Sequence, residues 1–341
     1  MKGRLIVLDQ WNGREAAALV QDGRLDDLLI ADDSAPRPGA IHRAVCDRPL
    51  KGQGGMFLRL ADGRTAWLRQ ARGLAAGDAL LVQVTGVAEA GKAVPVTDRL
   101  LFKGRYAIIT PGAPGVNVSR AIRDEETRAR LIALAGAPPE GMGVILRSAC
   151  ESAEDDEIML DLALMRDAAA RVMGDVGATP ELLLDGDGPH DHALREWSAD
   201  GIETGAGTFD ALGLADQIAA LASPLVDLGS ASMAVEVTRA LVAVDVNTGG
   251  DSSPAAALKA NLAAARQLPR QLRLRGLGGQ VVVDFVNMPK GQRQPLDQSL
   301  RSVFRADPVE TSLVGWTAMG LYELNRKRER APLARLIAED V

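Results

Sequence analysis

Short apolar runs separated by turn residues dominate the first hundred positions of the chain. Residues 16–30, AAALVQDGRLDDLLI, have the pattern of two strands joined by an Asp-Gly turn. Between residues 40 and 102, runs such as GGMFLRL, TAWLRQA and ALLVQVTGV alternate with Gly and Asp turns. This spacing predicts a small all-β module, a five-stranded barrel. The polar, Pro-rich stretch 31–39 between the two regions predicts a domain boundary.

The middle of the chain mixes strand and helix patterns. Residues 105–110 and 143–148 are predicted strands, and residues 155–173 form a predicted helix because apolar residues recur three and four positions apart. The acidic, Gly- and Pro-rich stretch 177–192 predicts a second boundary. The His-Asp-His triplet at its end is assigned to a solvated linker, because no third ligand type follows at metal-binding spacing.

A strand–helix–strand pattern follows over residues 240–288. The run ALVAVDVN has the character of a buried strand, and a long Ala/Leu/Arg helix then begins with Ser253 as N-cap and Pro254 in the first turn. The run QVVVDFVNM is the second buried strand. Such a βαβ unit predicts two parallel strands with a right-handed crossover. Further helices are predicted over 214–228 and 311–332.

Each of the two buried strands carries one carboxylate, Asp245 in VAVDV and Asp284 in VVVDF. A buried carboxylate is costly without a partner, and parallel strands bring both to the same end of the sheet. Asn247 lies two residues beyond Asp245 and therefore on the same strand face. Two carboxylates and an amide oxygen suit Mg²⁺ or Mn²⁺. The alternative is that each Asp caps a loop or pairs with an Arg.

Composition narrows the function classes. The chain has 47% hydrophobic and 25% charged residues and no apolar run that could span a membrane or serve as a signal peptide, so a globular cytoplasmic protein is expected. Cys46 and Cys150 lie far apart without a CxxC pair, which argues against a disulfide scaffold or a zinc site. The net charge is −6, but residues 266–335 hold 13 Lys and Arg against 6 Asp and Glu. This excess suits an anionic partner, or is simply a solvated surface.

The run ALVAVDVNTG, the spacer NLAAARQLPRQLRLRGLGG and the strand VVVDFVNM together resemble the catalytic subdomain of the ribonuclease E/G family. The resemblance extends to REAAALVQDGRLDDLLI, FKGRYAIITPGAPGVNVSR, MGVILRSA and MGLYELNRKRERAPL, and so to nearly the whole chain. It implies an α/β composite in five segments. These are an RNase H-like subdomain (1–36 and 190–220), an inserted OB-fold RNA-binding barrel (37–102), a 5′-phosphate sensor (103–189) and a DNase I-like catalytic subdomain (221–341).

The resemblance also implies a function and its residues. Asp245 and Asp284 correspond to the catalytic metal ligands, with Asn247 orienting them, and the metal activates the water that cleaves single-stranded RNA. The sensor of the terminal phosphate corresponds to Arg147, Ser148, Gly104 and Ile108. The paired aromatic residues that contact RNA bases correspond to Phe57 and Trp67, although without the resemblance these two residues favour a place in the core.

The sequence departs from the family pattern at several points. It has no CPxCxG motif, so no zinc is expected, and a homo-oligomer, if formed, is not held by a zinc link. Glu310 takes the place of a basic residue near the phosphate pocket, which opposes a functional 5′ sensor. Asn287 replaces an Asp in the usual IDM triplet.

Three functions remain open from the sequence. The first is a Mg²⁺-dependent endoribonuclease, and the second is a non-catalytic RNA-binding relative, favoured by Asn287 and Glu310. The third is a phosphatase of the haloacid dehalogenase type with Asp245 as nucleophile, because DVNT faintly resembles its DxDxT loop. Asn247 argues against the third, since that loop requires an acid there.

Overall fold

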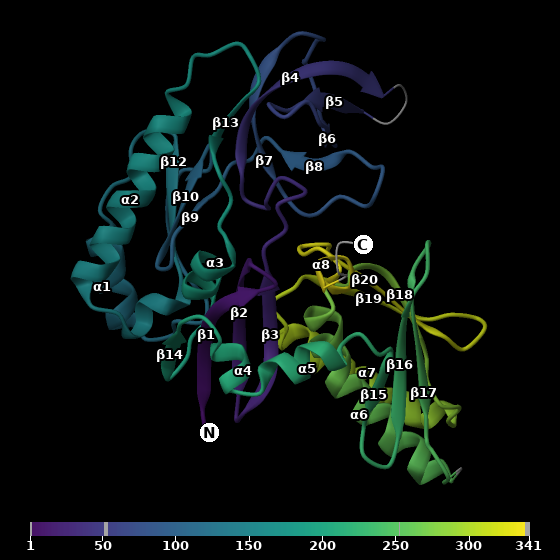
Figure 1. Ribbon diagram of the computed structural model, residues 1–341. Helices are drawn as coiled ribbons and strands as arrows, with labels where there is room; N and C mark the ends of the chain where they lie inside the picture. The colour runs from purple at the N-terminus through teal and green to yellow at the C-terminus, as the bar shows by residue number, and fades with distance from the viewer. Residues whose placement is uncertain (1, 51–53, 252, 338–341) are drawn as a thin grey trace. The chain divides into compact units, whose positions relative to one another are not determined.

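The computed structural model describes residues 2–50, 54–251 and 253–337 (Figure 1). The chain divides into two compact units. One unit runs from residue 33 to residue 196, and the other combines Met1–Asp32 with Trp197–Val341. Among the described residues, no helix is long and apolar enough to cross a membrane.

A closed β-barrel forms the first part of the unit of residues 33–196. Within its described residues, five strands pair in the order β4–β5–β6–β8–β7, and β7 pairs back with β4. The strands are β4 (Ile41–Leu50), β5 (Gly55–Arg59), β6 (Thr65–Leu68), β7 (Ala79–Val84) and β8 (Val94–Thr97). Alternate side chains such as Leu58 and Val82 fill the interior, as strand periodicity requires. The predicted five-stranded barrel is confirmed.

A second sheet with two helices follows the barrel in this unit. Its elements are β9 (Phe102–Lys103), β10 (Ala107–Pro111), β11 (Gly115–Val118), α1 (Glu125–Ala135), β12 (Met142–Leu146), the 3₁₀ helix η1 (Ser148–Ser152) and α2 (Asp155–Met173). The helix predicted over 155–173 is confirmed as α2. Its buried residues Ile158, Leu162 and Ala169 recur at helical spacing and face the core of this region.

The stretch 177–192, predicted as a linker, is instead ordered into β13 (Glu181–Leu184) and the start of α3 (Pro189–Glu196). The reason is a buried arginine on the barrel strand β4. The Arg43 guanidinium donates to Asp175 at 2.6 Å and to the Thr179 carbonyl at 2.5 Å, and it also pairs with Glu181. Glu181 within this stretch and Asp175 just before it therefore neutralise a buried cation, while β13 pairs with β4.

The other unit contains two sheets. The first has the order β14–β1–β2–β3 and is covered by α4 (Thr208–Ala211) and α5 (Leu214–Ala220). Its strands are β1 (Arg4–Trp11), β2 (Arg14–Gln21), β3 (Arg24–Ile30) and β14 (Gly201–Thr204). The predicted hairpin over 16–30 is confirmed, and its turn residues Asp22 and Gly23 both have positive φ, as a two-residue hairpin turn requires.

The second sheet has the order β15–β16–β17–β18–β20–β19. Its strands are β15 (Leu225–Asp227), β16 (Ser232–Val237), β17 (Val242–Asn247), β18 (Gly279–Asp284), β19 (Thr311–Trp316) and β20 (Tyr322–Arg326). The crossover helix α6 (Pro254–Leu274) joins β17 to β18, which are parallel as predicted. Ser253 caps α6 by accepting the Ala256 N–H at 3.2 Å.

Both long helices of this region pack on one face of the second sheet (Figure 1). Val244 and Val283 point into a core with Leu268 of α6 and Leu300 of α7 (Lys290–Ala306). The alternate strand residues point to the opposite face, where the side chains at the ends of β17 and β18 are exposed. The short helix α8 (Leu333–Ile337) packs against the first sheet through Leu333.

One predicted helix is wrong, and another is confirmed only in its first half. Residues 311–332 form the antiparallel strands β19 and β20, because Tyr322, Leu324 and Arg326 are buried at a period of two rather than three to four. The helix predicted over 214–228 ends at Ala220, since Pro224 cannot continue the backbone hydrogen bonding and β15 follows it.

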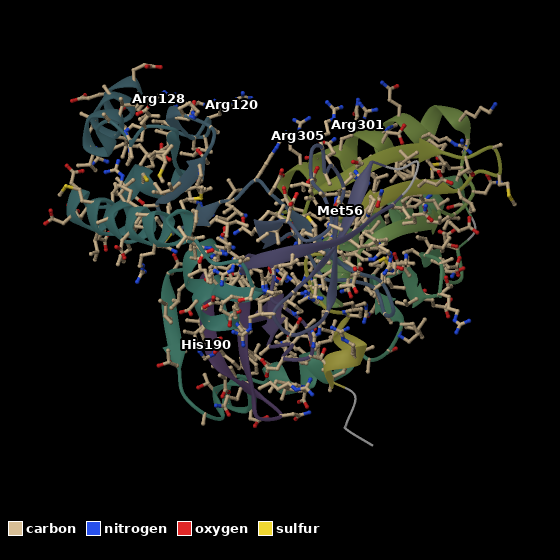
Figure 2. All side chains as sticks on the ribbon, turned by 90° about the horizontal axis from the view of Figure 1, so that it is seen from above. Met56, Arg120, Arg128, His190, Arg301 and Arg305 are labelled. Carbon is tan, nitrogen blue, oxygen red and sulfur yellow. The ribbon has the colours of Figure 1, made fainter. Side chains whose placement is uncertain are left out.

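The sequence reading also missed α7. Its apolar residues Leu296, Leu300 and Phe304 are four apart and buried, which is the signal that identifies an amphipathic helix. Arg301 and Arg305 are exposed and extend from the solvent side of this helix (Figure 2).

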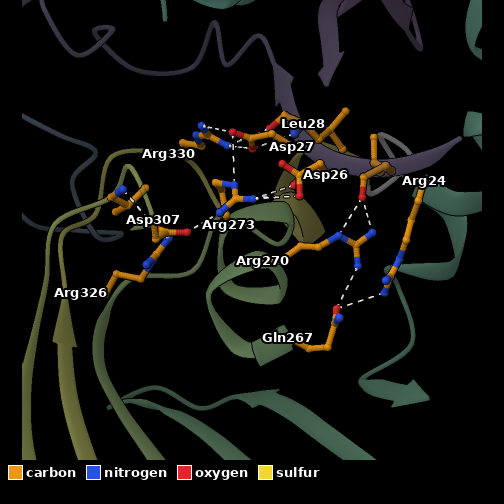
Figure 3. Close-up of polar contacts among 12 residues, drawn as sticks. Arg24, Asp26, Asp27, Leu28, Gln267, Arg270, Arg273, Asp307, Arg326 and Arg330 are labelled. Carbon is orange, nitrogen blue, oxygen red and sulfur yellow. Dashed lines mark hydrogen bonds and ion pairs between the residues drawn. The ribbon is translucent and has the colours of Figure 1, made fainter. Parts of the chain in front are cut away.

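A buried ionic network joins the two sheets of this unit (Figure 3). Arg273 of α6 pairs with Asp27 of β3 at 3.3 Å and with Asp307, which follows α7. Arg326 of β20 pairs with Asp307 at 2.7 Å, and Arg330 forms a two-oxygen pair with Asp27. The side chains of both carboxylates are at most 2% exposed.

The charges in this network compensate one another. Burial alone would raise the pKa of Asp27, but the guanidinium groups of Arg330 and Arg273 outweigh it and hold that pKa below its usual range. Asp27 is therefore ionised at neutral pH, and both of its oxygens accept hydrogen bonds. Loss of Arg273 leaves Asp27 and Asp307 with one cation each instead of two, and a buried carboxylate that loses a partner costs more than the pair itself contributes.

We expect Arg273→Met to lower the free energy of unfolding by about 3–5 kcal/mol, because it leaves Asp27 and Asp307 each short of one cation. Urea denaturation followed by circular dichroism measures the change. Arg266→Met is the control, since Arg266 is exposed on the same helix and has no ion pair among the described residues. That variant should stay within about 0.5 kcal/mol of the parent protein. Equal stabilities for the two variants would contradict a structural role of the network.

Candidate active site

The exposed face of the second sheet carries the predicted catalytic residues. Along β17, Val242, Val244 and Val246 are buried, and the residues between them point to the opposite face. Asp245 and Asn247 therefore share the uncovered face and are exposed. The alternation explains how an acidic residue lies within an apolar strand without being buried.

The parallel pairing of β17 with β18 brings the two carboxylates together. Asp245 lies directly opposite Asp284 in the register, so their Cα atoms belong to neighbouring strands about 4.8 Å apart. The Asn247 side-chain amide donates to Asp245 Oδ2 at 2.6 Å and fixes the orientation of that carboxylate. Among the described residues, neither Asp245 nor Asp284 forms an ion pair with Lys or Arg, which removes the support for the alternative of an Asp–Arg pair.

These oxygens suit a hard divalent cation. Two exposed carboxylates supply too few ligands for a closed protein cage, so a cation here would keep water molecules or take oxygen atoms from a substrate. The described residues contain no cluster of three or more His, Cys, Asp or Glu side chains that could hold a metal. The site therefore fits Mg²⁺ or Mn²⁺ in a substrate complex better than a tightly bound structural metal.

Asn261 of α6 is a residue of this region that the sequence reading missed. Its side chain is fully buried, donates to the Val286 carbonyl at 2.8 Å and accepts the Val286 N–H at 2.9 Å. These two bonds hold the segment directly after Asp284. An Asn inside an otherwise Ala- and Leu-rich helix face was the available signal, because a buried amide must find partners.

The predicted sensor residues surround the end of β12. Arg147 follows this strand and donates to the Gly104 carbonyl at 2.7 Å, and Ser148 is exposed at the start of η1. Ile108 pairs with Ile145, two residues before Arg147, and so lies on the same face as Arg147. The structure therefore places all four predicted sensor residues in one region.

The loop of Gly104 is held by Asp161 of α2. Its carboxylate accepts the N–H groups of Tyr106 and Ala107, each at 2.9 Å. A Cβ atom on Gly104 would lie 2.3 Å from the Asp161 oxygens, so only glycine fits this approach.

The arginine predicted to bind a terminal phosphate already has a carboxylate partner. Arg147 pairs with Glu196, the last residue of α3, which also accepts from Arg195 at 2.9 Å. Burial would raise the pKa of Glu196, but the hydrogen bond and charge of Arg147 outweigh it and keep that pKa below its usual range. A phosphate would have to displace this carboxylate. Glu196 is distant in sequence, and no local pattern singles it out.

Glu310, the other residue expected to oppose phosphate binding, lies in the other unit directly before β19 and is exposed. Its carbonyl accepts the Lys327 N–H at 3.0 Å. Its effect on the sensor stays a prediction.

Phe57 and Trp67 form a pair on the outer surface of the barrel. They lie opposite each other on β5 and β6, with ring centroids 4.9 Å apart and a tilt of 51°. The Arg48 guanidinium lies 5.1 Å from the Phe57 ring centroid. Both rings are half-buried and point away from the barrel interior, which is filled by other side chains. The pair is therefore a surface of two rings and a cation, rather than core.

The cysteines and the His-Asp-His triplet, which were considered as metal ligands in the sequence, lie in other elements than Asp245 and Asp284. Cys46 and Cys150 are both buried, in β4 and η1. Burial raises the pKa of the Cys150 thiol to about 11, so it holds its proton at neutral pH. His190 and His192 lie on α3.

The family model described as the Ribonuclease E/G family matches residues 102–206 and 201–329. This range includes the sensor region and the whole βαβ unit with Asp245 and Asp284. The chain belongs to the Ribonuclease E/G family. The barrel with Phe57 and Trp67 lies before the matched range.

Three relatives extend the comparison beyond the family model. The chain is 28% identical to Ribonuclease E of Nostoc sp. over 99% of its length and 58% of that protein. It is 29% identical to Ribonuclease E of Synechocystis sp. over 92% of its length and 53% of that protein. It is 28% identical to Ribonuclease G of Escherichia coli over 77% of its length and 62% of that protein. The chain thus spans between half and two thirds of these Ribonuclease E/G proteins.

We expect Gly55→Ala to displace the aromatic pair of this Ribonuclease E/G chain. A Cβ atom at Gly55 would lie 2.1 Å from Trp67 Cη2 and 2.8 Å from the Leu68 carbonyl oxygen. The variant should lose about 1–3 kcal/mol of stability and change its tryptophan fluorescence. Gly291→Ala is the control, because an added Cβ there meets no atom within 4 Å. Unchanged fluorescence and stability in Gly55→Ala would show that the pair tolerates the methyl group.

Proposed function

We propose that this chain is a divalent-metal-dependent endoribonuclease that hydrolyses single-stranded RNA. The observation that carries the proposal is the register that sets Asp245 beside Asp284 on an exposed sheet face. Membership of the Ribonuclease E/G family supports it.

The roles of the residues follow from their contacts. Asp245 and Asp284 would hold Mg²⁺ through carboxylate oxygens, and Asn247 orients Asp245 through its amide hydrogen bond. When bound, Mg²⁺ supplies a water of lowered pKa and neutralises charge on the phosphate that is attacked. Asn261 holds the backbone beyond Asp284, so that the second carboxylate keeps its place at the end of β18. None of these roles requires a histidine.

RNA binding is assigned to two further surfaces. Phe57 and Trp67 offer ring faces on which bases stack, and Arg48 adds a positive charge beside them. Residues 37–102 contain ten Lys and Arg against five Asp and Glu, so this barrel suits a polyanion. Arg147 would bind the 5′-terminal phosphate with two parallel hydrogen bonds once Glu196 is displaced.

A non-catalytic RNA-binding protein is the second candidate. Asn287 in place of an Asp favours it, because the segment after β18 then offers one carboxylate fewer. The intact set of Asp245, Asn247 and Asp284 favours catalysis. The two candidates differ in one result, the cleavage of RNA in the presence of Mg²⁺.

We expect Asp245→Asn and Asp284→Asn each to reduce RNA cleavage more than about 100-fold, because each removes an anionic metal ligand. Asn247→Ala should cost less, about 10- to 100-fold, since it only orients Asp245. The assay uses a fluorescent single-stranded RNA with Mg²⁺ or with excess EDTA.

Glu236→Gln is the matched control for these variants. Glu236 is exposed on the same sheet face, opposite Ala243. Its replacement by Gln changes a carboxylate to an amide, as the Asp→Asn replacements do. This control should cleave like the parent protein. Full activity in excess EDTA, or in either Asp variant, would contradict the assignment, and a parent protein that binds RNA without cutting it would favour the non-catalytic candidate.

We expect Glu196→Gln and Arg147→Ala to shift the preference for the 5′ end in opposite directions. Removing the competing carboxylate should raise the ratio of cleavage rates for 5′-monophosphate over 5′-hydroxyl RNA about tenfold, as one charged contact worth ~1–3 kcal/mol allows. Arg147→Ala should bring the ratio close to one. Glu140→Gln, an exposed change in the same unit, serves as the control. A ratio of one in both the parent protein and Glu196→Gln would make Arg147 a structural residue only.

A further inference from the structure

A pocket of about 560 Å³ opens beside the crossover helix, away from the sheet face of Asp245 and Asp284. Its walls come from the β2–β3 hairpin, from α6 and from the C-terminal end of α7. The volume lies within the usual range for small-molecule sites. Four arginines and three aspartates line it, namely Arg24, Arg266, Arg270, Arg273, Asp22, Asp26 and Asp307.

The three carboxylates of the pocket are already engaged. Asp307 pairs with Arg273 and with Arg326, and Asp26 lies 3.4 Å from Arg273. Asp22 accepts the Gly3 N–H at 2.9 Å. Arg273 thus pairs with two of the three acidic residues of the lining, Asp26 and Asp307, while Asp22 accepts a backbone N–H.

Among the described residues, the other three arginines form no ion pair with a carboxylate within 4 Å, although the charge of Asp26 acts on Arg270. Arg24 and Arg270 both donate to the same oxygen, Gln267 Oε1, at 3.1 and 3.5 Å, so two guanidinium groups converge on one neutral acceptor (Figure 3). Arg270 also donates to the Leu25 carbonyl, through Nε at 2.9 Å and through Nη2. Arg266 is exposed at the rim.

The electrostatics of Arg270 agree with an unbalanced positive charge. Burial, and then the nearby charge of Arg24, lower the pKa of Arg270 to about 10. The group is still charged at neutral pH, where its burial and its repulsion from Arg24 are unfavourable. The attraction of a bound anion would offset both the desolvation of the Arg270 charge and its repulsion from Arg24.

We propose that this pocket is a second anion site, which binds a phosphate group between Arg24, Arg266 and Arg270. Guanidinium groups match phosphate oxygens with paired hydrogen bonds. Two of them converge on Gln267 Oε1 and a third, Arg266, lines the same concave surface, which suits a tetrahedral or linked phosphate better than a single carboxylate. The phosphate belongs either to a small phosphorylated ligand or to the backbone of RNA bound elsewhere on the chain. The site is separate from the proposed catalytic residues and does not depend on their activity.

Inorganic pyrophosphate is the probe for the first source. Its binding is measured by isothermal titration calorimetry without divalent cations, with the parent protein and with Arg24→Gln/Arg266→Gln. Both replaced residues are exposed, so the fold should be retained, which urea denaturation checks. The dissociation constant should rise about tenfold or more in the double variant.

Single-stranded RNA is the probe for the second source. Fluorescence anisotropy measures its binding to Asp245→Asn, in which the proposed cleavage is blocked, with and without the two arginine changes. Arg239→Gln, an exposed charge loss between β16 and β17, is the control for a general loss of positive charge.

The outcomes separate the two sources. Weaker pyrophosphate binding with unchanged RNA binding identifies a free phosphate ligand, and weaker RNA binding identifies the RNA backbone. If neither probe responds to the double change more than to Arg239→Gln, or if neither binds at all, the pocket is not a phosphate site. RNA cleavage by Asp245→Asn would refute the proposed catalytic site, but it would not change what the binding measurements say about the pocket.

Discussion

Arg273 is the side chain on which the unit of Met1–Asp32 and Trp197–Val341 depends. It lies on α6, the helix that crosses from β17 to β18, and pairs with Asp27 of the first sheet and with Asp307 after α7. One guanidinium therefore ties the crossover helix to both neighbouring layers. Buried charges are costly unless their partners are in place, so few other packings of these layers would satisfy this group. The same helix holds the segment after Asp284 through Asn261.

The position of α6 has a direct consequence for the candidate active site. Because α6 and α7 both pack on one face of the second sheet, the other face is left open to solvent. Parallel sheets are usually covered on both faces, but β17 and β18 form the only parallel pair among the described strands of this sheet, and the antiparallel pairs around them tolerate an open face. Asp245 and Asp284 thus lie side by side without being desolvated. An open pair of carboxylates suits a large, flexible substrate that brings its own phosphate oxygens.

The sequence predicted those parts of the structure whose signals are local. The βαβ unit, the Ser253 cap, the helix over 155–173 and the five-stranded barrel follow from periodicity, capping chemistry and turn residues. The helix prediction for residues 311–332 was wrong because it followed their composition, whereas the burial of Tyr322 and Leu324 has strand periodicity. The order of the 177–192 stretch depends on Arg43, more than a hundred residues earlier, and cannot be read locally.

The candidate site shows the same division. The adjacency of Asp245 and Asp284 was predictable because one crossover fixes it, and Asn247 followed from the two-residue period of the strand. The ion pair between Arg147 and Glu196 was not predictable, since Glu196 contacts Arg147 only through the packing of α3.

The two arginine environments also differ in what a phosphate would meet. At Arg147 it would exchange one anion for another, and the cost of releasing Glu196 offsets part of the gain. At Arg24 and Arg270 it would replace a neutral amide oxygen and remove a repulsion between cations. For equal hydrogen bonds, the second exchange is the more favourable one. By this comparison the pocket of Arg24 and Arg270 is the more favourable of the two proposed phosphate sites.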